Sequence, residues 1–121
     1  MKLIEPSHLS AKLPHIAVVG AGAMGSIYAG MFAEAGYQTS VVDIWEEHIS
    51  AIGEKGLRLE GASGDRVIST IKAVNKVAEL DPADLYVIAT KAGGVAAAAA
   101  GIAEFMQTSS LVFTIQNGLG A

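Results

Sequence analysis

Three glycines near the start of the chain have the spacing of a phosphate-binding turn. Gly20, Gly22 and Gly25 follow an apolar run, residues 16–19, that predicts a buried strand. Gly20 allows a tight turn, Gly22 leaves room for a pyrophosphate beside the backbone, and Gly25 lets the following helix pack closely. Unpaired N–H groups at the start of that helix then face the phosphates. The turn predicted to bind a dinucleotide consists of Gly20, Ala21, Gly22, Ala23, Met24 and Gly25.

A carboxylate follows the next predicted strand, residues 38–42, at about the distance where a ribose-binding acid is expected. Asp43 can accept hydrogen bonds from both hydroxyls of an adenosine ribose, and it would repel the 2′-phosphate of NADP. Ile44 and Trp45 supply no cation for that phosphate, so the residues favour NAD. The alternative is that Asp43 caps a helix starting at Trp45 or Glu46. Trp45 either flanks the adenine or only packs against the protein.

Two more candidate positions follow predicted strands later in the chain. Lys91 comes directly after residues 85–90, and Asn117 and Gly118 come shortly after residues 111–115. Lys91 is either a solvated lysine or a contact to the cofactor or to a substrate carboxylate. Asn-Gly is a strong turn signal, but the Asn117 amide could instead be presented to a ligand hydroxyl.

The elements that must position these residues predict an α/β protein. The first helix has apolar residues at spacings of three and four and closes at Gly36; they are Met24, Ile27, Tyr28, Met31, Phe32 and Ala35. Later segments predict helices at 46–55 and 95–106, a hairpin of strands 57–60 and 66–74, and a connector at 79–84 with a helical turn.

This order predicts a Rossmann-type, doubly wound, mostly parallel sheet with helices on both faces. The first strand and the strand at 85–90, which is the fourth when the hairpin is counted as one, should be neighbours, with the topological switch point between them. The glycine turn, Asp43, Lys91 and Asn117 then lie at one edge of the sheet, where such folds bind ligands.

Composition narrows the function classes. The chain has 121 residues, enough for one domain, with 51% hydrophobic residues and a net charge of −4, which gives no support to nucleic-acid binding. It has no cysteine, which excludes disulfides and thiol chemistry and is compatible with a reducing cytoplasm. His8, His15 and His48 have no metal-ligand spacing and no carboxylate–serine partners, so we expect structural or surface roles and no metal site.

The ends of the chain set the predicted domain boundaries. Residues 1–14 lack the apolar core of a signal peptide and are expected to form a surface extension. No uninterrupted apolar run is long enough to cross a bilayer. We therefore expect residues 15–121 to form a dinucleotide-binding domain of a cytoplasmic protein with no membrane contact.

Four motifs together resemble the N-terminal domain of the ketopantoate reductases (2-dehydropantoate 2-reductases), and the resemblance covers residue 14 to the end. The motifs are Ile-Ala-Val-Val-Gly-Ala-Gly-Ala-Met-Gly-Ser-Ile-Tyr at 16–28, Ala-Glu-Ala-Gly-Tyr at 33–37, Ala-Thr-Lys-Ala at 89–92 and Gln-Asn-Gly-Leu-Gly at 116–120. The resemblance implies that the glycine turn binds the pyrophosphate and that Lys91 and Asn117 line the nicotinamide and substrate end. It also implies reduction of the ketone of 2-dehydropantoate with NADPH, on the pathway to pantothenate and coenzyme A.

The chain departs from this family pattern in two ways. The family usually has an arginine or similar group after the second strand, where this chain has Asp43, so NAD and NADP both stay open, as do other small 2-oxo acids. The family's second, helical domain carries the catalytic lysine and a substrate-binding glutamate, and it is absent from this chain. We therefore assign no catalytic residue, and we expect an incomplete active site whose bare apolar surface meets that domain or a second copy.

Two other functions fit part of the pattern. One is a stand-alone NAD(H)-sensing module without catalysis, like the regulatory domains of potassium transport systems. The other is the nucleotide domain of a different two-domain dehydrogenase, such as a hydroxyacyl-CoA or sugar-acid enzyme. Lys91 and the motif at 116–120 favour the reductase, because a sensor has no need of them.

Overall fold

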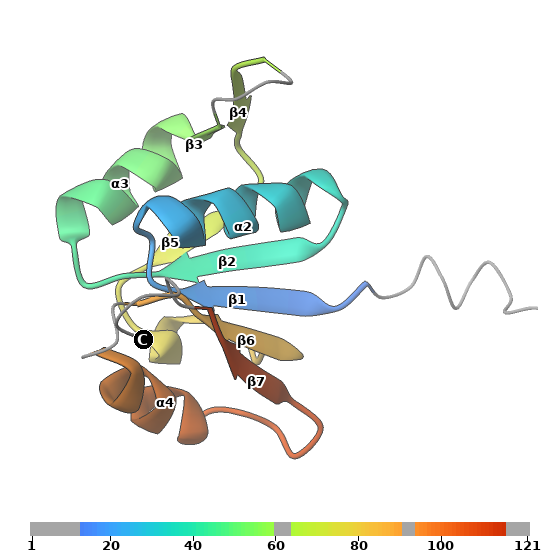
Figure 1. The fold of residues 1–121 in the computed structure, drawn as a ribbon, viewed down its shortest axis with the longest axis vertical. Coiled ribbons are helices and arrows are strands. Elements are labelled where there is room, and N and C mark those ends of the chain that lie inside the picture. The colour runs from blue at the N-terminus through green and yellow to red at the C-terminus, as the bar shows by residue number, and fades with distance from the viewer. Residues whose placement is uncertain (1–12, 60–63, 91–93, 116–121) are drawn as a thin grey trace, which may run out of the picture.

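The fold is built on a parallel five-stranded sheet with helices on both of its faces (Figure 1). The computed structural model describes residues 13–59, 64–90 and 94–115. The strands lie in the order β5-β2-β1-β6-β7, and each neighbouring pair is parallel. Their bounds are β1 His15–Val19, β2 Gln38–Val42, β5 Lys72–Val74, β6 Leu85–Ile88 and β7 Leu111–Thr114. The predicted Rossmann-type fold is confirmed, with β1 beside β6, the strand predicted at residues 85–90.

The sheet separates two apolar cores. Helices α2 (Ala23–Glu34) and α3 (Glu46–Lys55) cover one face, and α4 (Val95–Ala103) covers the other (Figure 1). Successive side chains of a strand point to opposite faces, so Val18 of β1 enters the core under α2 and α3, whereas Ala17 enters the core under α4. All of β1 is buried, as expected for a central parallel strand covered on both faces.

Helix α2 packs on the sheet through its smallest residues. Of the apolar residues whose spacing predicted this helix, Ile27 and Met31 are 51% and 54% exposed. The buried positions of the helix include Gly25, Ala29 and Gly30. The spacing therefore identified the helix but only part of the side that faces the core, because at Gly25 and Gly30 neighbouring segments leave no room for a Cβ.

The predicted single return strand at 66–74 is wrong. Strand β4 (Arg66–Ile68) pairs antiparallel with β3 (Leu57–Leu59), as the hairpin prediction required. The chain then leaves the hairpin, buries Ile71, and forms β5, which pairs with β2 in the main sheet. Residues 66–74 thus contribute to two sheets, because β4 pairs with β3 whereas β5 pairs with β2.

Other bounds differ from the predictions by a few residues. Helix α4 ends at Ala103 rather than 106, and just beyond it the Phe105 N–H donates to the Ile102 carbonyl, three residues back instead of the four of an α-helix. The helical turn expected within 79–84 is a 3-10 turn, η1 (Val77–Glu79). Strands β6 and β7 end before residues 90 and 115, and the end of the predicted strand 57–60 lies outside the described residues.

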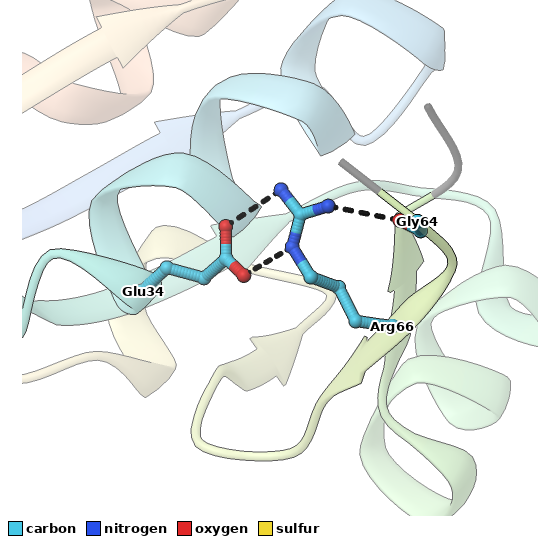
Figure 2. A network of polar contacts seen from close by, with 3 residues as sticks. All are labelled: Glu34, Gly64 and Arg66. Atoms are coloured by element: carbon cyan, nitrogen blue, oxygen red, sulfur yellow. Dashed lines mark hydrogen bonds and ion pairs between the residues drawn. The ribbon is translucent and has the colours of Figure 1, made fainter. Parts of the chain in front are cut away.

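The β3–β4 hairpin is attached to the far end of α2. The guanidinium of Arg66 donates to both carboxylate oxygens of Glu34, with Nη2 2.9 Å from Oε1, and its Nη1 donates to the Gly64 carbonyl at 3.1 Å (Figure 2). Nearer the middle of the helix, Leu59 lies over Gly30, where a Cβ atom would come within 2.6 Å of the leucine Cδ1. The hairpin therefore covers the second half of α2 and leaves its first turn uncovered.

A buried histidine at the start of β1 bonds to the neighbouring strand β2 and to the segment before β6. His15 Nδ1 lies 3.2 Å from the Pro82 carbonyl, and its Nε2 lies 2.8 Å from Ser40 Oγ on β2. A carbonyl only accepts, so Nδ1 carries the proton and the serine hydroxyl donates to Nε2. The structural role predicted for His15 is confirmed, while His8 lies outside the described residues.

Candidate dinucleotide-binding site

The turn between β1 and α2 needs glycine at two positions for the fold itself. Gly20 has φ 111°, a conformation that side chains rarely adopt, and its N–H donates to the Val42 carbonyl at 2.7 Å. A Cβ at Gly25 would lie 1.9 Å from the Gly20 carbonyl oxygen and 3.2 Å from the Ala89 Cβ. The roles predicted for these glycines, a tight turn and close packing, agree with this geometry.

Gly22 differs from its two neighbours. Apart from its own chain neighbours, no atom of the described residues lies within 4 Å of the position of a Cβ at Gly22, so neighbouring chain segments do not require glycine. Gly22 caps α2 with extended backbone, and the first turn of the helix contains no acidic residue. The unpaired N–H groups in the first turn of α2 and the positive end of the helix dipole favour an anion at this position. The space beside Gly22 that neighbouring described segments leave open is the place where the sequence predicts the pyrophosphate.

Asp43 connects the end of β2 to the glycine turn. Its Oδ2 accepts the Ala21 N–H at 2.7 Å, and its Oδ1 accepts the Trp45 N–H at 3.1 Å. The Oδ1 contact lies within the turn before α3, whose N-cap is Trp45 without a side-chain cap, so the alternative prediction that Asp43 caps this helix is wrong. The Oδ2 contact is one that the sequence did not suggest. A carboxylate has about four acceptor sites, so both oxygens keep capacity for ribose hydroxyls.

The segment after Asp43 is open to solvent and uncharged. Ile44 is 91% exposed and Trp45 is 61% exposed, so neither position supplies a cation for a 2′-phosphate. The Trp45 ring stacks on the His48 ring, with centroids 5.1 Å apart and an interplanar angle of 29°. This stack lies beside Asp43, on the side expected for an adenosine.

Sequence reasoning missed two residues at this edge of the sheet. Asn75 follows β5 and donates from Nδ2 to the Asp43 carbonyl at 3.0 Å, and its position after a strand, like that of Asp43, was an available signal. His48 Nε2 lies 2.6 Å from the Ala21 carbonyl oxygen, a contact that no motif in the sequence indicates. His48 is therefore part of the glycine-turn environment.

The described residues bring together only part of the predicted site. The glycine turn, with Ala23 and Met24 in the first turn of α2, lies beside Asp43. Lys91, Asn117 and Gly118 lie outside the described residues, so their roles stay predictions. The strands that precede them, β6 and β7, run parallel to β1 and end at the same edge of the sheet.

Two negative observations apply to residues 13–59, 64–90 and 94–115. No group of three or more histidine and acidic side chains there could hold a metal ion. No helix in these ranges is both long enough and apolar enough to span a bilayer.

The strand order and the glycine turn define a Rossmann-type α/β domain. A family model described as ketopantoate reductase PanE/ApbA matches residues 16–121. The chain belongs to this family, as its motifs suggested.

Individual relatives agree with this assignment. The 2-dehydropantoate 2-reductase of Pyrococcus abyssi is 38% identical over 105 residues, which are 87% of this chain and 33% of that protein. A PanE/ApbA family ketopantoate reductase from Ralstonia eutropha JMP134 superposes with a TM-score of 0.77 at 34% identity, covering 86% of this chain and 34% of the other. The chain thus spans about a third of the length of the relatives it matches.

A further solved neighbour was determined with ligands. The ternary structure of D-mandelate dehydrogenase with NADH and anilino(oxo)acetate has a TM-score of 0.76 and 28% identity, covering 88% of this chain and 34% of that one.

Proposed function

We propose that residues 15–121 form the NAD(P)-binding domain of a reductase that acts on a small 2-oxo acid. The observation that carries this proposal is the open space beside Gly22, flanked by the Asp43 carboxylate, in a chain of the ketopantoate reductase family. The family match favours this enzyme over a stand-alone sensing module. The 2-oxo acid is 2-dehydropantoate if the substrate is that of the Pyrococcus abyssi relative. A cytoplasmic location stays a prediction.

The residues of this chain would bind and orient the cofactor. The N–H groups after Gly22 hold the pyrophosphate, and Asp43 accepts hydrogen bonds from the adenosine ribose. Lys91 and Asn117 are proposed to contact the nicotinamide and substrate end. When bound, NAD(P)H supplies a hydride to the ketone carbon, and the ketone oxygen takes a proton from an acid. By resemblance that acid belongs to a second, helical domain, so no catalytic residue is assigned here.

We propose NAD(H) as the preferred cofactor, because Asp43 repels a 2′-phosphate and Ile44 and Trp45 offer it no cation. The D-mandelate dehydrogenase neighbour solved with NADH supports this choice. The test is a calorimetric titration of the chain with NADH and with NADPH. Tighter binding of NADPH would contradict the preference, and binding of neither would contradict the proposed function.

A gain of function at Ile44 sharpens this test. Because Ile44 is 91% exposed, Ile44→Arg adds a cation without disturbing the core. A charge-assisted hydrogen bond to phosphate is worth roughly 1.5–3 kcal/mol, so NADPH affinity should rise about tenfold or more while NADH affinity stays nearly unchanged. Ile44→Gln, of similar length but uncharged, should leave both affinities as they are. An equal gain in both variants would show that charge is not the cause.

A further inference from the structure

The carbonyl group of Ala21, between the first two glycines, is held by a side chain from the next helix. His48 Nε2 lies 2.6 Å from this oxygen, and Ser26 Oγ donates to it at 3.0 Å. Because a carbonyl oxygen only accepts, the His48 contact is an Nε2–H donation. The serine belongs to the helix that the turn begins, whereas His48 lies 27 residues away in α3. His48 therefore ties a separate element to the glycine turn.

The N–H group of Ala21 is bonded as well, to the residue that follows β2. This N–H donates to Asp43 Oδ2 at 2.7 Å. A trans peptide is planar, with its C=O and N–H pointing in opposite directions, and no peptide bond in the described residues is cis. Holding the Ala21 carbonyl toward His48 thus fixes the direction of the Gly22 N–H, one of the donors that the proposed site offers to a phosphate.

The imidazole of His48 also touches the proposed adenosine side. Its ring stacks on Trp45 with centroids 5.1 Å apart, and Trp45 precedes α3 two residues after Asp43. The ring and the Nε2–H of His48 therefore make two separable contacts, one with an exposed indole and one with the glycine turn.

We propose that His48 is a positioning residue of the dinucleotide site, and that it acts through the hydrogen bond from Nε2 to the Ala21 carbonyl. This inference rests on the proposed function. The hydrogen bond sets the peptide plane between Ala21 and Gly22 before the ligand arrives, so binding does not have to order it. Unlike Asp43, His48 is not required to touch the cofactor for this role.

Two substitutions separate the two contacts. His48→Phe keeps an aromatic ring for Trp45 but removes the donor, whereas His48→Gln keeps an N–H donor but removes the ring. Ser50→Ala, exposed on the same helix, is the matched control. The chain has one tryptophan, so fluorescence of Trp45 can follow titrations with NADH and with ADP, and thermal unfolding checks that each variant is folded.

We expect His48→Phe to weaken NADH and ADP by about the same factor, roughly fivefold, as for the loss of one hydrogen bond. His48→Gln and Ser50→Ala should bind within about twofold of the unaltered chain, a difference smaller than the worth of a typical hydrogen bond. ADP contains the adenosine and the pyrophosphate but no nicotinamide, so equal losses place the effect on that half of the cofactor. Retained affinity in His48→Gln, which lacks the ring, then assigns it to the hydrogen bond at the turn.

Other outcomes would overturn the inference. Equal weakening by His48→Gln and His48→Phe would show that the ring matters rather than the donor. Unchanged affinity in both, or a loss with NADH but not with ADP, would show that the Ala21 contact does not position the turn. If the unaltered chain binds NADH but the variants show one of these patterns, the proposed function stands and the role of His48 fails. If the unaltered chain binds neither ligand, the proposed function itself fails, and the inference with it.

Discussion

The two ends of helix α2 are held in place in opposite ways. At its start, Gly25 lies so close to the Gly20 carbonyl that a single extra carbon atom would collide with it. At its end, Glu34 reaches Arg66 of the hairpin through two long, partly exposed side chains (Figure 2). Close backbone contact tolerates no change, whereas a solvated ion pair contributes little to stability. The comparison shows that the start of α2, where the candidate site lies, is specified more strictly than the end of that helix.

Gly25→Ala should have the largest effect. The new Cβ would lie 1.9 Å from a backbone oxygen, and the helix would have to move off the sheet. We expect the free energy of unfolding to fall by about 3 kcal/mol or more, measured by urea denaturation. Gly53→Ala is the matched control, because Gly53 lies in α3 with open space around it; alanine there should stabilise the helix by about 0.5–1 kcal/mol. An equal change in the free energy of unfolding of the two variants would show that the close contact at Gly25 does not determine the effect of the substitution.

Gly22→Ala tests the open side of the same turn. Its Cβ would meet no atom of a neighbouring segment, so the free energy of unfolding should change by about 1 kcal/mol or less. The methyl group would occupy the space proposed for the pyrophosphate, and NADH affinity should fall about tenfold or more, equivalent to about 1.4 kcal/mol. Calorimetric titration and urea denaturation of the same variant check both expectations. Retained affinity would show that the cofactor does not approach Gly22.

Glu34→Gln should have the smallest effect, because the ion pair at the far end of α2 is solvated. The hydrogen bond that Arg66 donates to Glu34 holds the pKa of this carboxyl below its usual value of 4.5. A carboxyl whose pKa is lowered by folding stabilises the protein above its unfolded pKa, and this contribution is lost as the pH falls through the folded pKa.

The measurement is the thermal midpoint of the unaltered chain and of Glu34→Gln between pH 7 and pH 3. The unaltered chain should be slightly more stable at pH 7, and the two midpoints should converge at acidic pH. Arg58 and Asp65 form a more exposed ion pair within the same hairpin. Asp65→Asn, which removes the negative charge of that pair, is the control. A difference between unaltered chain and Glu34→Gln that grows as the pH falls would contradict the expectation.

The sequence predicted a parallel sheet with β1 beside β6 because its signals are local, but it did not predict β5 at the edge of that sheet. The apolar run before Gly20 and the acid after β2 fix the first βαβ unit, and right-handed crossovers then place the remaining strands. The division of residues 66–74 between two sheets was not predictable, since β4 and β5 have similar β-branched composition and differ only in the partners that the tertiary structure supplies. The buried side of α2 was likewise hidden, because Gly25 and Gly30 have no side chain and Ala29 has only a methyl group.

The candidate site was predictable where a residue type has one dominant use. A carboxylate after β2 or a glycine before a helix has a defined role in this fold, whereas a histidine within a helix has many. His48 was therefore treated as a surface or structural residue, although it lies at the turn. The hydrogen bond from the Ala21 N–H to Asp43 was also not predictable, because it depends on how far β2 extends beside β1.

The buried histidine at the start of β1 has a consequence for that alignment. Ser40 can meet His15 only when β2 lies at the offset observed, with His15 opposite Gln38 and Val19 opposite Val42. A slip of one residue would shift β2 by about 3.3 Å and turn its side chains to the opposite face. Asp43 would then lose Ala21. The contact between His15 and Ser40 thus fixes the alignment of β2 on β1. This alignment sets the position of the Asp43 carboxylate at the other end of these strands.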